Sequence, residues 1–236
     1  MSALRATFAI ARREMRPSWL RSVALRVAFG AVLACIGRFY FHYGDVDVMS
    51  LVAVPLGVIA GIEPRVRDLT YFIAPLYGRQ LARAHAITAV IAALVFPIAF
   101  LVAHLFSSHA LGYAGYLDYS QGVHLDVLRG PPQLIDWDSM IASKSLVAAV
   151  ASVAAALIAL SATLRRGVAR VAYLALGCLA GYFITTFSLT SLMTLSFLGA
   201  DVFIPEIAGE SVAGLLIGFF ALRAFGETLA RYDPIP

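Results

Sequence analysis

Six long apolar runs alternate along this chain with connections whose charge changes sign. Of the eighteen basic residues, thirteen lie in four of these connections. They are Arg5, Arg12, Arg13, Arg16, Arg21, Arg65, Arg67, Arg79, Arg83, Arg165, Arg166, Arg170 and Arg231. The other connections carry mainly Asp and Glu. Because basic loops are retained in the cytoplasm, this alternation predicts an even number of membrane crossings with both termini inside the cell.

The apolar runs have the length of membrane-spanning helices, which need about 20 residues each. A hydrophobic fraction of 61% and a mean hydropathy of +0.84 also separate the chain from soluble proteins. We predict an all-α polytopic protein of the plasma (inner) membrane with six transmembrane helices and both termini cytoplasmic. The predicted spans are 22–41, 46–62, 84–106, 139–163, 171–192 and 211–230, and together with their connections they form a domain over 22–236 with an outer loop at 107–138.

Residues 1–21 are predicted to form an amphipathic helix that lies in the inner membrane interface. Phe8 belongs to an apolar stripe at helical spacing, while Arg5 and Arg12 fall together on another face. Arginines on such a helix face lipid phosphates, so membrane lipids are expected partners. Pro17 is expected to separate this helix from the first span. The alternative is a basic tail that only sets the topology.

Two arginines, Arg26 and Arg38, fall inside the first span. They are about 18 Å apart at a rise of 1.5 Å per residue. Long side chains near opposite helix ends can extend to the water on their own side. We therefore expect each arginine to reach its own interface as an anchor of the helix.

Small residues recur at the spacing that lets helices approach closely in lipid. Three G-x-x-x-G pairs occur on three different spans: Gly57 with Gly61, Gly177 with Gly181, and Gly214 with Gly218. Helix association in a membrane depends on van der Waals contact, which small residues permit. The pairs predict a compact bundle and leave a subunit interface open.

Hydroxyl side chains are concentrated in the fifth span, where Thr186, Thr190 and Thr194 form one stripe. Threonine hydroxyls in a helix usually bond to the preceding turn and pack against neighbouring helices. The functional alternative is the uncharged, polar wall of a translocation pathway. The sequence leaves both interpretations open.

Sequence patterns for enzymatic chemistry are absent. The chain has no phosphate-binding G-x-x-x-x-G-K-[S/T] loop, no G-x-S-x-G nucleophile and no H-E-x-x-H pair. Its histidines are not spaced as metal ligands, and Cys35 and Cys178 fall in apolar runs as small hydrophobes. The pI of about 9.3 is explained by basic loops that face anionic lipids, without a nucleic-acid partner. We expect neither enzymatic activity nor a cofactor in this chain.

The connection between the second and third predicted spans, Glu63–Arg83, carries a short apolar face between charged residues and is divided by Pro75. After the proline, Arg79 and Arg83 lie one helical turn apart and lead into the third span. This pattern predicts a short helix at the cytoplasmic surface. Taken alone, it is an interfacial helix that connects two spans.

The overall layout resembles the permeases of ABC-2 type ABC transporters. It combines a basic amphipathic N-terminus, two spans, a charged short helix ending P-x-x-x-R-x-x-x-R, six spans in all and a short basic connection at Arg165–Gly167. The resemblance implies that 63–75 is the coupling helix that docks into a separate cytoplasmic ATPase subunit. The residues at which it implies contacts are Glu63, Arg65, Arg67, Asp68, Leu69, Tyr71, Phe72 and Pro75.

The same resemblance implies ATP and Mg²⁺ in the partner ATPase and a second permease chain, either identical or a sister subunit. It also implies that the connection 198–210, with Pro205 and Glu206 at its tip, folds back into the outer membrane face. The expected function is export of a lipid, glycolipid, haem-like or drug-like amphiphile, with the membrane subunit of the cytochrome c maturation haem exporter as a close variant. The alternative is a non-transporting assembly or scaffold protein that binds a partner through its outer loop.

Overall fold

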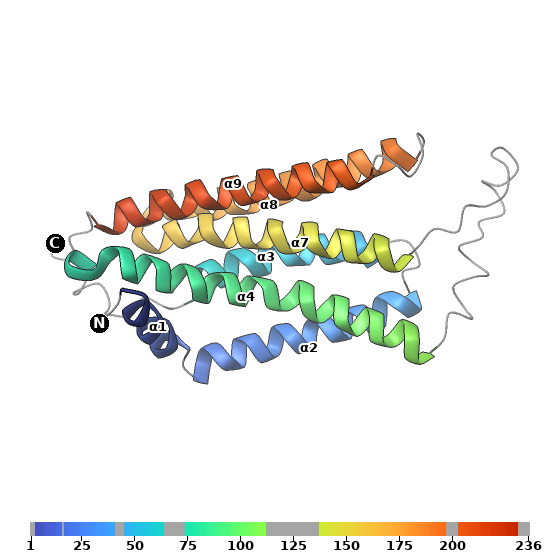
Figure 1. Ribbon diagram of the computed structural model, residues 1–236, viewed down its shortest axis with the longest axis horizontal. Coiled ribbons are helices and arrows are strands. Elements are labelled where there is room, and N and C mark those ends of the chain that lie inside the picture. The colour runs from blue at the N-terminus through green and yellow to red at the C-terminus, as the bar shows by residue number, and fades with distance from the viewer. Residues whose placement is uncertain are drawn as a thin grey trace, which may run out of the picture.

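The computed structural model describes residues 3–15, 17–40, 45–63, 74–111, 137–196 and 203–230, and these residues contain helices and no strand. The chain folds into a bundle of long helices (Figure 1). The elements are α1 (Ala3–Glu14), α2 (Pro17–Tyr40), α3 (Asp45–Ile62), α4 (Ala74–Leu111), α7 (Trp137–Leu160), the 3₁₀ turn η1 (Ser161–Leu164), α8 (Gly167–Ser196) and α9 (Phe203–Ala230).

Five helices of the described chain are long and apolar enough to cross a membrane, so this is a multi-pass helical membrane protein. Their apolar stretches are Pro17–Ile36, Gln80–Phe106, Lys144–Leu164, Gly167–Thr185 and Ser211–Leu229. The remaining predicted span coincides with α3, which contributes the shorter apolar stretch Leu51–Ile62.

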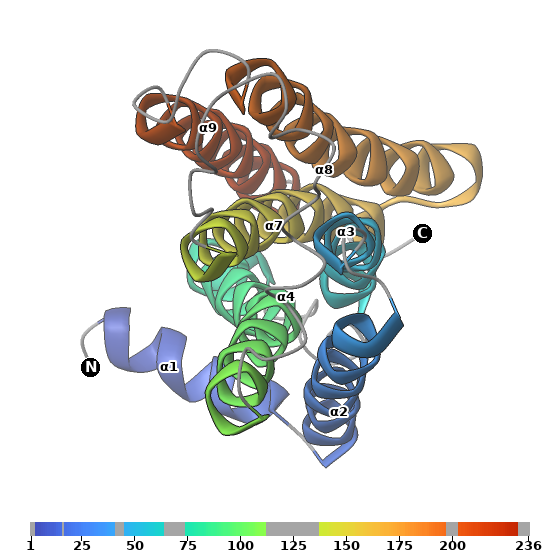
Figure 2. The same cartoon turned by 90° about the vertical axis from the view of Figure 1, so that its right-hand side faces the viewer.

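The central helix of the bundle is α7, with α3, α4, α8 and α9 arranged around it (Figure 2). In the apolar stretch of α7, 83% of the residues are buried, against about a fifth in the stretches of α2, α8 and α9. Alanine dominates the buried positions of α7 between Ala148 and Ala162. Small side chains let four neighbours approach this one helix closely, which is how a membrane bundle gains contact area.

The Gly57 and Gly61 pair of α3 packs directly on α7. A methyl group added at Gly57 would collide with the backbone oxygen of Ser152, and one at Gly61 with that of Ala156. Because these obstacles are backbone atoms, no side-chain rotation can make room. The first G-x-x-x-G pair therefore forms a helix contact inside the chain.

The other two glycine pairs also make contacts within the bundle. Gly177 of α8 faces the backbone of α7, and Gly181 faces Val54 of α3. Gly214 and Gly218 of α9 face side chains of α7. The compact packing predicted from these pairs is thus present within one chain.

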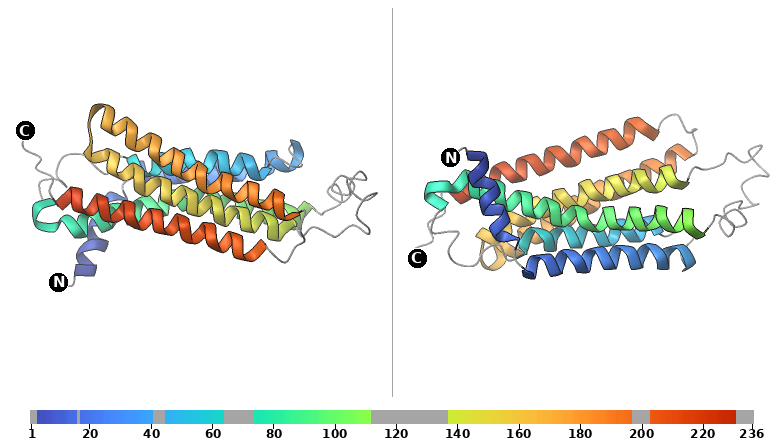
Figure 3. Two further views of the ribbon diagram at one scale, coloured as in Figure 1. Left: turned by 90° about the horizontal axis from the view of Figure 1, so that it is seen from above. Right: turned by 60° about the horizontal axis from the view of Figure 1, so that its bottom comes forward.

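All the described chain segments that border basic connections lie at one end of the bundle, here called the basic end (Figures 1 and 3). It comprises α1, the start of α2, the end of α3, the start of α4, the turn between α7 and α8, and the end of α9. The exposed arginines in these segments are Arg5, Arg12, Arg21, Arg83, Arg165, Arg166, Arg170 and Arg223. One of them, Arg165, lies over the ring of Tyr173 at 5.5 Å from its centroid.

Several helices extend beyond the predicted spans, most clearly at the starts of α2, α4 and α9. α2 begins at Pro17 rather than Ser22, because proline has a helical φ and lacks only an N–H that has no partner in a first turn. Trp19 is consequently part of the bundle and packs against alanines of α3, α4 and α7. α4 has 38 residues, which makes it about 57 Å long, so it extends well beyond the span predicted at 84–106.

The fold-back implied at 198–210 is wrong for the residues that the structure describes. Pro205 and Glu206 lie in the first turn of the continuous helix α9, not at the tip of a separate connection. Proline is tolerated there because the N–H groups in the first turn of a helix have no intrahelical acceptor, so a missing N–H removes no hydrogen bond.

Candidate functional site at the basic end

The predicted coupling segment 63–75 connects the end of α3 to the start of α4. Glu63 directly follows α3, and Pro75 lies in the first turn of α4. The other predicted contact residues lie outside the described part of the chain: Arg65, Arg67, Asp68, Leu69, Tyr71 and Phe72. The structure therefore describes the two ends of this segment, which are Glu63 after α3 and the start of α4, and the contacts that hold each end.

The α3 border is held by a buried ion pair between Glu63 and Arg26 of α2. The guanidinium Nη1 donates to the carboxylate Oε2 at 3.1 Å, and the side chains expose only 4% and 12% of their surface. The expectation that Arg26 extends to the membrane interface as an exposed anchor is therefore wrong. The carboxylate at the end of the neighbouring helix is within reach, and a buried guanidinium needs a charged partner more than a route to water.

This ion pair can be compared with a second one at the same end. Arg223 and Glu227 of α9 are also 3.1 Å apart, but their side chains expose 67% and 57%. Exposed pairs of this kind contribute little, because water already solvates both charges. The pair of Arg26 with Glu63 joins residues 37 positions apart and is shielded from water, so it fixes one helix to another.

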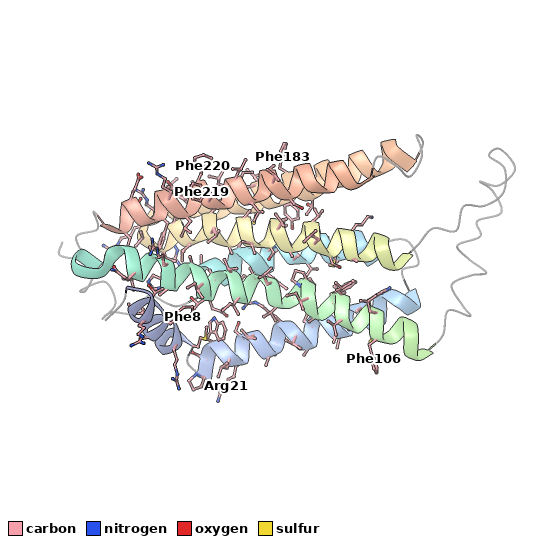
Figure 4. The ribbon with its side chains drawn as sticks, in the orientation of Figure 1. Phe8, Arg21, Phe106, Phe183, Phe219 and Phe220 are labelled. Carbon is pink, nitrogen blue, oxygen red and sulfur yellow. The ribbon has the colours of Figure 1, made fainter. Side chains whose placement is uncertain are left out.

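The α4 border of the segment is held by α1. Thr7 and Ala11 of α1 are buried, and Ile10 packs against a cluster formed by α4, α7 and α9. α1 lies across the basic end of the bundle (Figure 3). Its opposite side remains exposed, including Phe8 with 56% of its surface (Figure 4). The N-terminal helix is therefore docked on one face and available to the membrane surface on the other.

A buried core cluster lies behind this border and joins α4, α7 and α9. It consists of Leu81, Ala82, Leu160, Phe225 and Leu229. His85 of α4 is fully buried next to it and meets the ring of Phe225 edge-on, with centroids 6.3 Å apart. The position of His85 one turn after Leu81, on the packed face of α4, is the signal that could have identified it as a core residue.

The predicted hydroxyl stripe lies on the second half of α8. Thr186, Thr190 and Thr194 belong to this helix, but their side chains are outside the described set. The adjacent Thr185 is described, and its hydroxyl donates to carbonyls of its own helix at Gly181 and Tyr182. Thr185 therefore bonds to its own preceding turn, as expected of a threonine that serves helix packing. For Thr186, Thr190 and Thr194, both the packing interpretation and the pathway interpretation stay open.

Among the described residues, no group of three or more His, Cys, Asp or Glu side chains is placed to hold a metal ion. At the basic end, Glu63 at the α3 border of the predicted segment is bonded to α2, and α4, which begins at the other border, packs against α1.

Comparison with protein-family models, curated proteins and solved structures finds no match for this chain.

Proposed function

We propose that this chain is the permease subunit of an ATP-driven transporter of the ABC-2 type. The observation that carries the proposal is the buried ion pair between Arg26 and Glu63. It attaches the first residue of the predicted coupling helix to α2 as well as to α3. A force applied to residues 64–73 from below would be delivered to two helices of the bundle rather than absorbed by a loose connection.

Three further features support the same function. The five helices that are long and apolar enough for a membrane make up most of the described chain. The exposed arginines gather at the end that carries the predicted docking segment. α1 packs on α4 and thereby supports the far border of that segment. Energy would therefore enter through a separate cytoplasmic subunit that binds ATP and Mg²⁺.

In this proposal two permease chains, identical or sister subunits, enclose the pathway and two ATPase subunits bind beneath them. Closure of the ATPase dimer on ATP pushes the coupling helices and moves the bundles between inward-open and outward-open states. The permease supplies different affinities for the substrate in these two states.

The proposed cargo is an amphiphile, such as a lipid, a glycolipid, a haem-like molecule or a drug-like molecule, and the proposed direction is export. The hydroxyl stripe at Thr186, Thr190 and Thr194 would line an uncharged, polar path. Such a path suits a headgroup attached to an apolar body better than a bare ion, because moving an ion out of water costs far more than moving a neutral polar group.

The test is affinity purification of the tagged chain from the membranes of its own source in mild detergent. We expect an ATPase chain with a phosphate-binding loop to co-purify in a 1:1 ratio and to hydrolyse ATP in the isolated complex. If the chain purifies under several detergents without such a subunit, the proposal is wrong. A partner that binds only the outer loop would instead support a scaffold.

A further inference from the structure

α3 contains a proline in its interior, and the carbonyl that this proline leaves free is bonded by another helix. Pro55 has no N–H, so the carbonyl of Leu51 lacks its usual donor four residues later. Tyr182 of α8 supplies the missing donor, with its hydroxyl 2.9 Å from the Leu51 oxygen. In lipid, where no water can bond the free carbonyl, such a replacement is what allows proline inside a helix.

The same arrangement occurs in α4. Pro97 removes the donor for the carbonyl of Ala93. Ser152 of α7 donates its hydroxyl to that oxygen at 3.1 Å. Ser152 is fully buried, so this bond forms inside the bundle. Both interior prolines of the described helices are thus compensated by a side-chain hydroxyl from a neighbouring helix.

Ser152 of α7 contacts both of the helices that contain an interior proline. This residue bonds the free carbonyl of α4 and also lies against Gly57, two residues after Pro55 in α3. α7 itself has no interior proline and is the most buried helix. α7 is therefore the rigid helix of this region, and the two helices with an interrupted hydrogen-bond ladder, α3 and α4, both pack against it.

We propose that α3 and α4 bend at Pro55 and Pro97, and that the hydroxyls of Tyr182 and Ser152 hold both helices in the observed conformation. In this proposal the halves of α3 and α4 toward the basic end, whose Ala60 and Ala89 belong to one packed cluster, tilt relative to the opposite halves of the same helices. A helix bends most easily where its hydrogen-bond ladder is interrupted. Ser152 can keep a bond in the bent state by turning to a carbonyl of its own preceding turn.

This inference goes beyond the proposed function, because the bending belongs to the chain alone and needs neither ATP nor an ATPase. If no ATPase partner exists, bending of α3 and α4 can still be measured on the chain alone. If the helices are rigid, the chain can still be a permease that moves as a solid body.

The experiment is pulsed electron paramagnetic resonance on doubly spin-labelled protein in lipid nanodiscs, with Cys35 and Cys178 replaced by alanine. Labels at Ile59 and Phe220 report on the α3 half at the basic end, and labels at Arg83 and Val168 report on the α4 half. Labels at Phe106 and Val212, near the other ends of α4 and α9, provide the reference. The side chains at all six label positions are exposed.

We expect two distance populations for the basic-end pairs and one for the reference pair. Pro55→Ala and Pro97→Ala restore the main-chain donor, so each should remove the second population for its own helix. Tyr182→Phe and Ser152→Ala should enlarge it. Thr185→Val is the matched control, since that hydroxyl bonds only its own helix, and Pro17→Ala is the control for a proline in a first turn.

A single population at the basic end that none of the four variants changes would overturn the proposal. So would equal changes in the basic-end and reference pairs, because the whole bundle would then be loosened. The alanine variants at Pro55 and Pro97 restore a hydrogen bond and should fold, so the test does not depend on the hydroxyl variants being stable.

Discussion

Arg26 and Glu63 form an ion pair of 3.1 Å between the first membrane helix and the residue that follows α3, and the two side chains expose only 4% and 12% of their surface. Residues that a reading of the sequence assigns to two different surfaces, a lipid interface and a docking segment, are in fact each other's partners.

Removing one member of this pair should destabilise the protein strongly. Arg26→Ala leaves a carboxylate in a poorly hydrated place, and we expect a loss of about 3–5 kcal/mol in the free energy of unfolding. Arg223→Ala breaks a pair of equal length that is exposed, and it should cost about 0–1 kcal/mol. Chemical unfolding in detergent micelles, followed by circular dichroism, measures both. Equal losses in the two variants would show that burial of the first pair is unimportant.

Gly57→Ala should disturb the contact between α3 and α7. The new methyl group would meet the backbone of Ser152, which cannot move aside without separating the helices, and overpacking of this kind costs about 1–3 kcal/mol. Gly226→Ala on α9 is the matched control, because its methyl would meet nothing closer than 3.9 Å. That control should be neutral or stabilising by about 0.5–1 kcal/mol, since alanine favours helices over glycine. A neutral Gly57→Ala would contradict the close approach.

The hydroxyl of Tyr182 should matter only while Pro55 is present. Tyr182→Phe is expected to cost about 0.6 kcal/mol, and at most about 1.7, which are the values for hydrogen bonds between membrane helices. In the Pro55→Ala background the Leu51 carbonyl has its own helical donor, so the same change should cost less. The double-mutant cycle is measured by unfolding in micelles. Additive effects would mean that the hydroxyl and the proline are not linked.

The orientation of the bundle is tested by single-cysteine variants in a background without Cys35 and Cys178. Val168 lies at the start of α8 in the basic end, and Leu111 ends α4 at the opposite end. A membrane-impermeant maleimide should label Leu111→Cys in intact cells and Val168→Cys only after the membrane is opened, because basic loops stay in the cytoplasm. The reverse pattern would place the predicted docking segment outside the cell and exclude an ATP-driven partner there.

The helical membrane class could be predicted from the sequence because the length of an apolar run and the sign of its flanking charges are local properties. The glycine pairs could also be interpreted, since small residues at a spacing of four have one main use in lipid. The number of crossings and the orientation stay predictions beyond the five apolar helices that the described chain contains.

The partner of a buried group could not be predicted in the same way. Arg26 lies 37 residues from Glu63, and nothing near either residue indicates the other. The roles of the Tyr182 and Ser152 hydroxyls could not be predicted either, although the sequence did indicate that such donors were needed. An interior proline always frees the carbonyl four residues earlier, so Pro55 and Pro97 implied that two donors on other helices must exist. Only the packing of the helices shows which ones.

The predicted coupling segment itself provides the most direct test of the account. The measurement is ATP hydrolysis coupled to transport by the co-purified complex in lipid vesicles, for the wild type and for Arg67→Glu and Asp68→Arg. We predict that each charge reversal uncouples hydrolysis from transport while the thermal stability of the permease stays unchanged, because both residues would contact the ATPase and not the bundle. Unchanged coupling in both variants would contradict the docking role of this segment.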